Sequence, residues 1–391
     1  MRYQIIDTPL VFEDALSLRA TGLDVGEVSR QKKHVNGSPS SIRVQIKTAY
    51  RLINPEPSPT SGDSSKPTVV VVHGATLGSV GYLRFQDQLV AAGYPCLMYD
   101  GIGRGYTDRI TKESLKFNLV TDHLEARQPD NCSRLGPKCS LLSILAVQLD
   151  TLLKALVAKG DLTENTVISF IGVSLGGAVV TSFMDMMRTG VDLRIQSISY
   201  HVPVVGRVVS KMTWNMCLML FVTCMCKLGP VVEKLLFRYM IRKIMLARAE
   251  RKRKDESIPM EQHFGISHFI AQFRVKGCGN FMLSLLHQVV NLSTLEDVHA
   301  RLSSGSDVDA IKQSVNGVKS RNNSDVPLQF IYARDDDEVD FREVEKVISL
   351  YERNHYSGTI DVKVFTGGHF MLYGNFEEVM EHVFAFFDHA L

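Results

Sequence analysis

One stretch constrains the fold of this chain more than any other: an apolar run from Val167 to Ile171, followed by a serine between glycines. The run is typical of a strand buried on both faces of a parallel sheet. Residues 172–176 read G-V-S-L-G, a G-x-S-x-G match centred on Ser174, and an apolar, helix-compatible segment continues from Ala178 to Met187. A strand, a tight turn and a helix form the context in which this motif lifts a serine hydroxyl above a sheet. The glycines are needed because side chains there would collide with neighbouring backbone.

Two later segments supply partners for this serine, in a fixed order along the chain. The apolar strand Pro327–Ala333 ends in an acidic stretch, and Val362–Phe365 leads to Gly367-Gly368-His369. A serine hydroxyl is protonated at neutral pH and needs a base within hydrogen-bond reach. The base in turn needs a carboxylate that holds its tautomer. Serine, acid and histidine in this order are typical of one class of catalytic triad.

Four motifs together carry a family resemblance. His73-Gly74-Ala75 follows the strand Val69–Val72, and Asp100 to Gly105 reads D-G-I-G-R-G after the next strand. With the serine and histidine motifs, they resemble the α/β-hydrolase superfamily, and within it the capped serine hydrolases of the lipase and esterase (monoacylglycerol-lipase-like) type. The match covers about residues 43–200 and residue 327 to the end. It implies a mostly parallel central sheet flanked by helices, with a helical cap inserted after the sixth strand.

The resemblance implies roles for two residues directly. Ser174 is expected to be the nucleophile, and His369 the base that later protonates the leaving group. Two backbone N–H groups should stabilise the oxyanion: that of Leu175, directly after the nucleophile, and that of Ala75, after the His-Gly pair. His73 is expected to be a structural turn residue rather than a second base.

The triad acid has to be chosen among five acidic residues after the strand Pro327–Ala333. These are Asp335, Asp336, Asp337, Glu338 and Asp340. The stretch resembles the family pattern G-x-x-D-x-x-V-P, with Ala333 in place of the glycine and Asp340 in place of the proline. The resemblance therefore implies Asp336 as the acid, with Asp335 as the alternative. Acidic clusters of this kind are otherwise usually solvated loop surface.

The domain organisation follows from a change of pattern after His201. Strand signals vanish there and return near residue 326, which divides the chain into an α/β-hydrolase core (residues 1–201 and 326–391) and a helical cap or lid (residues 202–325). Met212–Cys226 is fifteen residues long and uncharged, shorter than the ~20 residues of a membrane span. It fits either a cap helix buried against the core or a lid that contacts lipid. Val231–Lys254 carries nine Lys or Arg, which fit a solvated helix end or an anionic membrane surface.

Composition excludes several classes of protein. The net charge of +2 over 391 residues favours neither nucleic acid nor an acidic partner. The seven cysteines are odd in number and scattered, without metal-ligand spacing, so reduced thiols in the cytoplasm are expected. The first residues lack the apolar core of a secretory signal. The glycines at 101, 103 and 105 read G-x-G-x-G rather than the dinucleotide-binding G-x-G-x-x-G. No metal and no organic cofactor is expected.

The sequence thus predicts a serine hydrolase that cleaves carboxylic esters through an acyl-enzyme. The apolar cap favours a lipid-like small-molecule acyl ester, such as an acylglycerol, with peripheral membrane contact through the cap. Thioesterases and C–C bond hydrolases use the same triad and remain alternatives. A different class, a non-catalytic hydrolase-fold protein that binds a lipid or a partner, would not need an activated serine.

Overall fold

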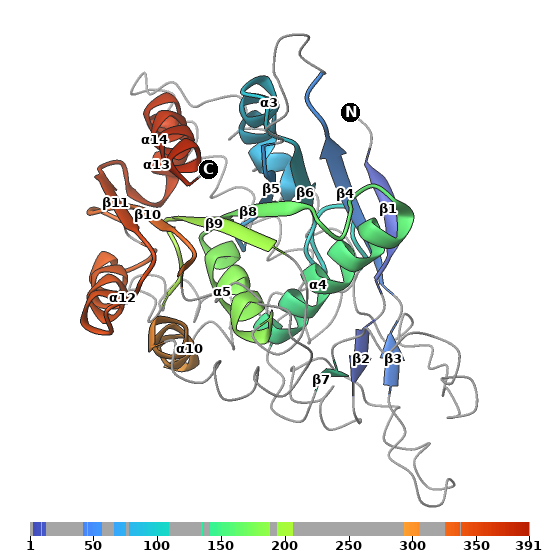
Figure 1. Cartoon of the computed structure of the whole chain (residues 1–391), viewed down its shortest axis with the longest axis horizontal. Helices are drawn as coiled ribbons and strands as arrows, with labels where there is room; N and C mark the ends of the chain where they lie inside the picture. The colour runs from blue at the N-terminus through green and yellow to red at the C-terminus, as the bar shows by residue number, and fades with distance from the viewer. Residues whose placement is uncertain are drawn as a thin grey trace, which may run out of the picture.

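An eight-stranded sheet crosses the computed structural model of this chain, with helices on both of its faces (Figure 1). The structure describes residues 3–8, 10–12, 42–44, 46–56, 66–75, 78–108, 134–135, 141–187, 194–205, 293–304, 325–336 and 338–390. The apolar stretch of the predicted cap, Met212–Cys226, and its basic stretch, Val231–Lys254, both lie outside these residues. Their roles stay predictions.

The strands of this sheet are parallel over most of its width. Their order is β1 (Gln4–Asp7), β4 (Lys47–Ile53), β6 (Cys96–Tyr99), β5 (Thr68–Val72), β8 (Val167–Val173), β9 (Arg194–His201), β10 (Leu328–Ala333) and β11 (Ile360–Phe365). β1 pairs antiparallel with β4, and β4 antiparallel with β6, whereas every pair from β6 to β11 is parallel. The prediction of a mostly parallel sheet flanked by helices is confirmed. A small separate sheet joins β3 (Ile42–Val44), β2 (Leu10–Phe12) and β7 (Arg134–Leu135).

Strand β5 shows how the sheet builds two hydrophobic cores. Successive side chains of a strand point to opposite faces. Val69 and Val71 accordingly pack with buried residues of α3 (Leu83–Ala91) and α14 (Phe376–His389). Val70 and Val72 pack with those of α4 (Leu141–Lys159), α5 (Leu175–Met187) and α12 (Phe341–Arg353) on the other face. A continuous apolar strand is therefore needed at the centre of the sheet, as the sequence indicated.

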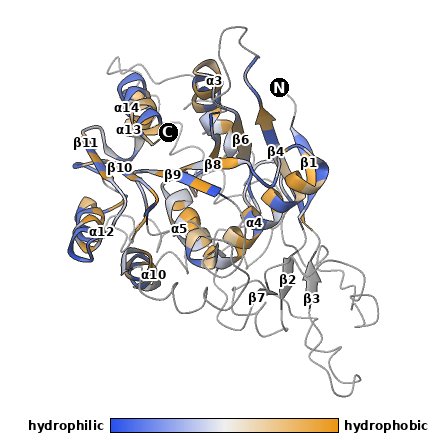
Figure 2. Ribbon diagram, viewed as in Figure 1, coloured by the Kyte–Doolittle hydropathy of each residue, from blue (hydrophilic) through white to orange (hydrophobic). Residues whose placement is uncertain are grey.

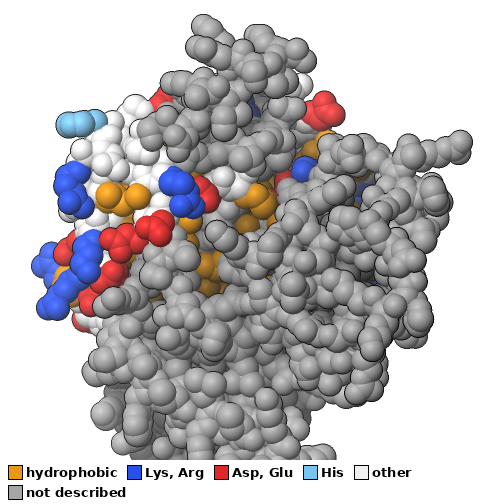
Figure 3. Space-filling model, turned by 90° about the horizontal axis from the view of Figure 1, so that it is seen from below, with side chains coloured by type: hydrophobic (Ala, Val, Ile, Leu, Met, Phe, Trp, Pro, Cys, Tyr) orange, Lys and Arg blue, Asp and Glu red, His pale blue; other side chains and the backbone are white. Residues whose placement is uncertain are grey.

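Helix α12 illustrates how the sequence sets a helix start and its buried face. Asp340 is its N-cap, and the carboxylate accepts a hydrogen bond from Arg342 N–H (3.1 Å). Such a cap typically stabilises a helix by about 1 kcal/mol. Apolar side chains recur three or four residues apart and are buried: Val344, Val347, Ile348 and Tyr351. Figure 2 shows hydrophilic residues along the outer side of this helix. Seen from below, acidic and basic side chains lie interspersed on the described part of the surface (Figure 3).

Helix α10 (Ser293–Ser304) falls within the range predicted as the cap, and it packs against α5 and α12. Arg301 on α10 donates two hydrogen bonds to the Asp185 carboxylate on α5 (3.1 and 2.6 Å). His299 is buried between the rings of Tyr200 and Tyr351, and its Nδ1 lies 3.1 Å from the Tyr351 hydroxyl. Part of the predicted insertion thus belongs to the helical layer of the sheet. No helix in the described ranges has the length and hydropathy of a membrane span.

We expect the free energy of unfolding to fall as the pH drops below 6.5, in part through His299. Burial lowers the pKa of His299 from 6.5 to about 3. The unfolded chain therefore binds a proton there first, and this contribution to stability is complete above pH 6.5 and lost as the pH falls toward 3. In urea unfolding, His299→Gln should remove about 2.5 kcal/mol of the stability difference between pH 7 and pH 4.5.

Between pH 7 and pH 8 the two proteins should show nearly parallel stability curves, because the histidine is largely neutral in both the folded and the unfolded state there. If His299→Gln loses as much unfolding free energy between pH 7 and pH 4.5 as the wild type does, this pH dependence does not come from His299.

Candidate active site

The strand-to-helix turn contains one residue. β8 ends at Val173 and α5 begins at Leu175, and Ser174 between them has φ +52°, in the left-handed region. Its N–H donates to the His201 carbonyl at the end of β9 (2.9 Å), and its own carbonyl accepts from Gly177 N–H and Val204 N–H (both 3.0 Å). A non-glycine residue in this conformation is strained and persists only when its surroundings fix it. These three backbone hydrogen bonds do so.

Two glycines of the motif are required by close backbone contact. A Cβ on Gly176 would lie 2.0 Å from the Val72 carbonyl oxygen, and one on Gly172 would lie 2.8 Å from Gly177 Cα. Real Cβ atoms do not approach backbone this closely. α5 is thus pressed against the end of β5, and the serine hydroxyl is presented at the carboxyl edge of the parallel strands.

The structure brings Ser174, His369 and Asp336 together at this edge. His369 Nε2 lies 3.0 Å from Ser174 Oγ, and His369 Nδ1 lies 2.9 Å from Asp336 Oδ2. Asp336 follows β10, and His369 lies in the 3-10 turn η5 (Gly368–Phe370) after β11. The two side chains are 3% and 9% exposed, so their interaction is shielded from water. An ionised carboxylate only accepts hydrogen bonds, so Nδ1–H donates to Asp336 and Nε2 is left to accept the serine proton.

The remaining acidic residues of this loop have separate contacts. Asp336 Oδ1 accepts from the N–H groups of Glu338 and Val339 (2.8 and 2.9 Å), which fix its orientation. Asp335 instead accepts from Gly368 and Gly367 N–H (3.1 and 3.0 Å), and these bonds lower its pKa. Of the two candidates for the acid, Asp336 lies against His369. Asp335 lies against the backbone of the two glycines that precede His369. Asp340 caps α12, and Asp337 lies outside the described residues.

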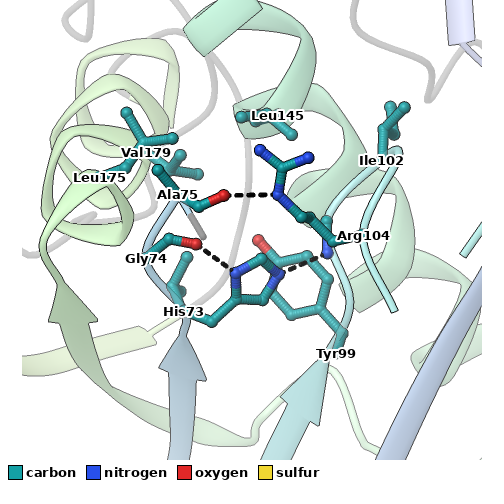
Figure 4. Close-up of a pocket in the computed structure, with 11 residues that line it drawn as sticks. His73, Gly74, Ala75, Tyr99, Ile102, Arg104, Leu145, Leu175 and Val179 are labelled. Carbon is teal, nitrogen blue, oxygen red and sulfur yellow. Dashed lines mark hydrogen bonds between the residues drawn. The ribbon is translucent and has the colours of Figure 1, made fainter. Parts of the chain in front are cut away.

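The predicted oxyanion donors flank the serine. Leu175 is the first residue of α5, where a backbone N–H has no acceptor in a preceding helical turn and lies at the positive end of the helix dipole. The loop of Ala75 approaches from the other side: a Cβ on Gly74 would lie 3.3 Å from Ser174 Cβ. Ala75 and Leu175 also line one pocket (Figure 4). The positions suit two donors that converge on one oxygen.

Buried side chains hold the loop from residue 73 to residue 75 in place (Figure 4). His73 Nε2 accepts from Gly101 N–H (2.8 Å), so its Nδ1–H donates to the Gly74 carbonyl (2.7 Å). Burial lowers the pKa of His73 and favours this neutral form. Arg104 Nε donates to the Ala75 carbonyl (2.5 Å). Both nitrogens of His73 are engaged by backbone, as a turn residue requires.

A small hollow, partly open to solvent, lies beside this loop. Its wall is mostly apolar: Val72, Tyr99, Ile102, Leu145, Leu175 and Val179. Arg104 is the charged residue in the wall. The lining beside Ala75 and Leu175 is therefore mostly apolar in character.

Some residues of the site could not be singled out from the sequence. Arg104 stands inside the D-G-I-G-R-G motif, but nothing in the motif indicates that it binds the Ala75 carbonyl. Tyr82, whose hydroxyl lies 3.4 Å from Gly74 N, carries no motif signal. Glu338 is one of the five acidic residues after β10, and no motif indicates that its Oε2 lies 3.5 Å from His369 Nε2. Across the residues described, no group of three or more His, Cys, Asp or Glu is arranged to hold a metal ion.

Comparison with known proteins gives structural likeness only. No protein-family model and no curated protein sequence matches the chain. A carboxylesterase of the ammonia-oxidizing thaumarchaeon Nitrososphaera gargenis is similar to 90% of this chain and 97% of its own, at 13% identity and a TM-score of 0.52. A thermophilic esterase from Thermogutta terrifontis, with malate bound, is similar over 88% and 94%, at 13% identity and a TM-score of 0.50. Likeness at this identity establishes the fold and leaves the reaction to be argued from the site.

The glycine contacts predict a sharp difference between two substitutions. Gly176→Ala should destabilise the protein by at least about 3 kcal/mol, because the new methyl would meet the backbone of β5. Gly374→Ala, at the end of α13 (Met371–Gly374), adds a methyl with nothing within 4 Å and should change stability by less than about 1 kcal/mol. Denaturant unfolding of both variants measures this. Equal stability of the two would contradict the close approach of α5 to β5.

Proposed function

We propose that this chain, which has the α/β-hydrolase fold, is a serine hydrolase that cleaves carboxylic esters through an acyl-enzyme intermediate. One observation carries the proposal: a serine on a strained strand-to-helix turn lies 3.0 Å from a histidine that itself lies 2.9 Å from a buried carboxylate. A base oriented by an acid is what a serine hydroxyl needs in order to attack.

The reaction would run in two halves on these side chains. Ser174 Oγ attacks the ester carbonyl carbon while His369 Nε2 takes its proton, and Asp336 stabilises the resulting imidazolium. The N–H groups of Ala75 and Leu175 stabilise the negative oxygen of the tetrahedral intermediate. His369 then protonates the departing alcohol, which leaves the acyl group on Ser174. In the second half, a water activated by His369 attacks the acyl-enzyme, releases the acid and restores the serine.

A lipid-like acyl ester, such as an acylglycerol, is the substrate class we propose. The apolar lining of the small hollow beside Ala75 and Leu175 fits an acyl substrate better than a charged one. The uncharged stretch Met212–Cys226 in the predicted cap supports a hydrophobic one. Esterases among the similar solved structures are compatible with the reaction, although their likeness extends to the fold alone.

Hydrolysis of p-nitrophenyl esters with acyl chains from C2 to C16 tests the proposal. We expect activity in the wild type and a loss of at least about 10³-fold in Ser174→Ala, because the acyl-enzyme can no longer form. An optimum at C8 or longer would support the lipid-like class, and an optimum at C2 would contradict it while leaving the esterase intact. Equal rates in wild type and Ser174→Ala would contradict the nucleophile.

The choice of acid gives a second prediction. Asp336→Asn should lower kcat by on the order of 10³- to 10⁴-fold, because an amide can donate to Nδ1 and favour the wrong tautomer. Asp335→Asn should lower kcat by less than about tenfold, since its amide oxygen still accepts from the backbone of Gly367 and Gly368. The two variants carry the same charge change and serve as mutual controls. A larger effect in Asp335→Asn would assign the acid to Asp335.

A further inference from the structure

Strand β11 is an edge strand of the eight-stranded sheet: it pairs with β10 on one side and ends the order of the strands that the structure describes. Figure 1 shows it on the left outer side, between α12 and α14. Val362, in the middle of the strand, is 40% exposed. An edge strand presents a row of backbone N–H and C=O groups to which another strand can bind.

Two hydrogen bonds near the ends of the strand fix which of its backbone groups face β10. The Thr359 carbonyl accepts from Leu328 N–H (2.9 Å), and the Phe365 carbonyl accepts from Arg334 N–H (3.1 Å). Every second residue of a strand turns its backbone groups to the same side, and the register with β10 is unbroken from residue 360 to residue 365. The odd-numbered residues therefore face β10. The even-numbered ones turn their N–H and C=O groups to the outer edge: Ile360, Val362 and Val364.

Two opposite charges lie on one face of β11, two residues apart. Asp361 accepts a hydrogen bond from Gln329 Nε2 (2.7 Å), and Lys363 Nζ lies 3.9 Å from Glu378 Oε1 on α14. Both residues also reach solvent, since Asp361 is exposed and the Lys363 side chain is 36% exposed. Val362, between them, projects to the opposite face of the sheet.

This charge order favours one register for antiparallel pairing of two copies of β11. A two-fold interface is self-complementary, and the outward groups of both strands meet only when the axis passes through a residue. An axis at Asp361 or at Lys363 places that charge opposite itself, which is destabilising. An axis at Ile360 or Val364 leaves both charges without an opposite charge across the interface. An axis at Val362 places Asp361 of each copy opposite Lys363 of the other.

We propose that β11 is an interaction surface for a second copy of this chain, which pairs antiparallel with it about a two-fold axis at Val362. The sheet then continues across the interface. The two Asp361–Lys363 pairs fall where facing side chains of an antiparallel ladder are closest, and β-branched side chains face each other on the other side of the sheet. One short strand makes a small interface, so we expect a reversible dimer with a Kd on the order of 10 µM.

Sedimentation equilibrium of the full chain over a range of concentrations measures this Kd. Asp361→Lys places lysines opposite each other, and Lys363→Asp places aspartates opposite each other, so each change should raise Kd at least about tenfold. Asp7→Lys is the charge-matched control, because Asp7 is exposed on β1 at the opposite edge of the sheet. It should change Kd less than about threefold.

An equimolar mixture of the two reversed variants tests the register. One variant carries lysine at both positions and the other carries aspartate at both, so the mixed dimer has opposite charges at both contacts. We expect the mixture to dimerise with a Kd within about threefold of the wild-type value, although neither variant does so alone. The double variant, in which the two charges are exchanged, should dimerise as well. Recovery in the mixture also shows that both variants are folded.

A proline at the axis tests the backbone pairing. The Val362 N–H points to the outer edge, so Val362→Pro removes a hydrogen bond of the dimer and none of those to β10. We expect a monomer at concentrations at which the wild type is a dimer, with a melting temperature close to that of the wild-type monomer.

A wild type that stays monomeric up to about 500 µM would overturn the inference, because even weak specific interfaces associate below this concentration. The charges on β11 would then serve to keep edge strands apart. A dimer that persists in Val362→Pro or in both charge reversals would also overturn it, since another surface would then hold the copies together. So would a mixture of the two reversed variants, each folded by circular dichroism, that fails to dimerise.

Discussion

The contact between the start of α5 and the end of β5 is the constraint on which the site depends. Gly176 lies so close to the Val72 carbonyl that a methyl group would overlap it. This contact turns the chain sharply enough to hold Ser174 at φ +52°. It also places Leu175 at a helix N-terminus and the loop of Ala75 beside the serine. Nucleophile and oxyanion donors thus share one backbone arrangement, and a change in the turn would move all of them.

The second half of the site is assembled from three parallel strand ends. β8, β10 and β11 end at the same edge of the sheet and deliver Ser174, Asp336 and His369. Five acidic residues follow β10 at this edge. Those that the structure describes have different hydrogen-bond partners, and these partners give them different roles. Asp336 accepts hydrogen bonds from two backbone N–H groups, which orient it toward His369. Asp335 binds the N–H groups of the glycines before His369, and Asp340 is the N-cap of α12. Glu338 is directed to the other nitrogen of the ring.

The sequence predicted the parts of this structure that depend on local pattern. The sheet could be predicted from its continuous apolar strands. The residues that meet at its edge could be predicted from the spacing around Ser174 and the order of the motifs. Only the resemblance to the family pattern favoured Asp336 over Asp335. Both residues follow the same strand, and their roles differ because of backbone hydrogen bonds that the sequence does not show. The positions of Arg104, Tyr82 and Glu338 depend on contacts between distant segments, which no local pattern encodes. Most of the range predicted as the cap, residues 202–325, lies outside the described residues, and its role stays a prediction.

The central claim is that His369 and Asp336 activate Ser174, and covalent labelling tests it most directly. A fluorophosphonate reacts with a serine only when a neighbouring base activates it. The account predicts one adduct in the wild type, located by peptide mass spectrometry at Ser174, and labelling slowed by at least about 10³-fold in a folded His369→Ala variant. A wild type that stays unlabelled, or a His369→Ala variant labelled at the wild-type rate, would contradict the claim and favour a protein that binds its ligand without catalysis.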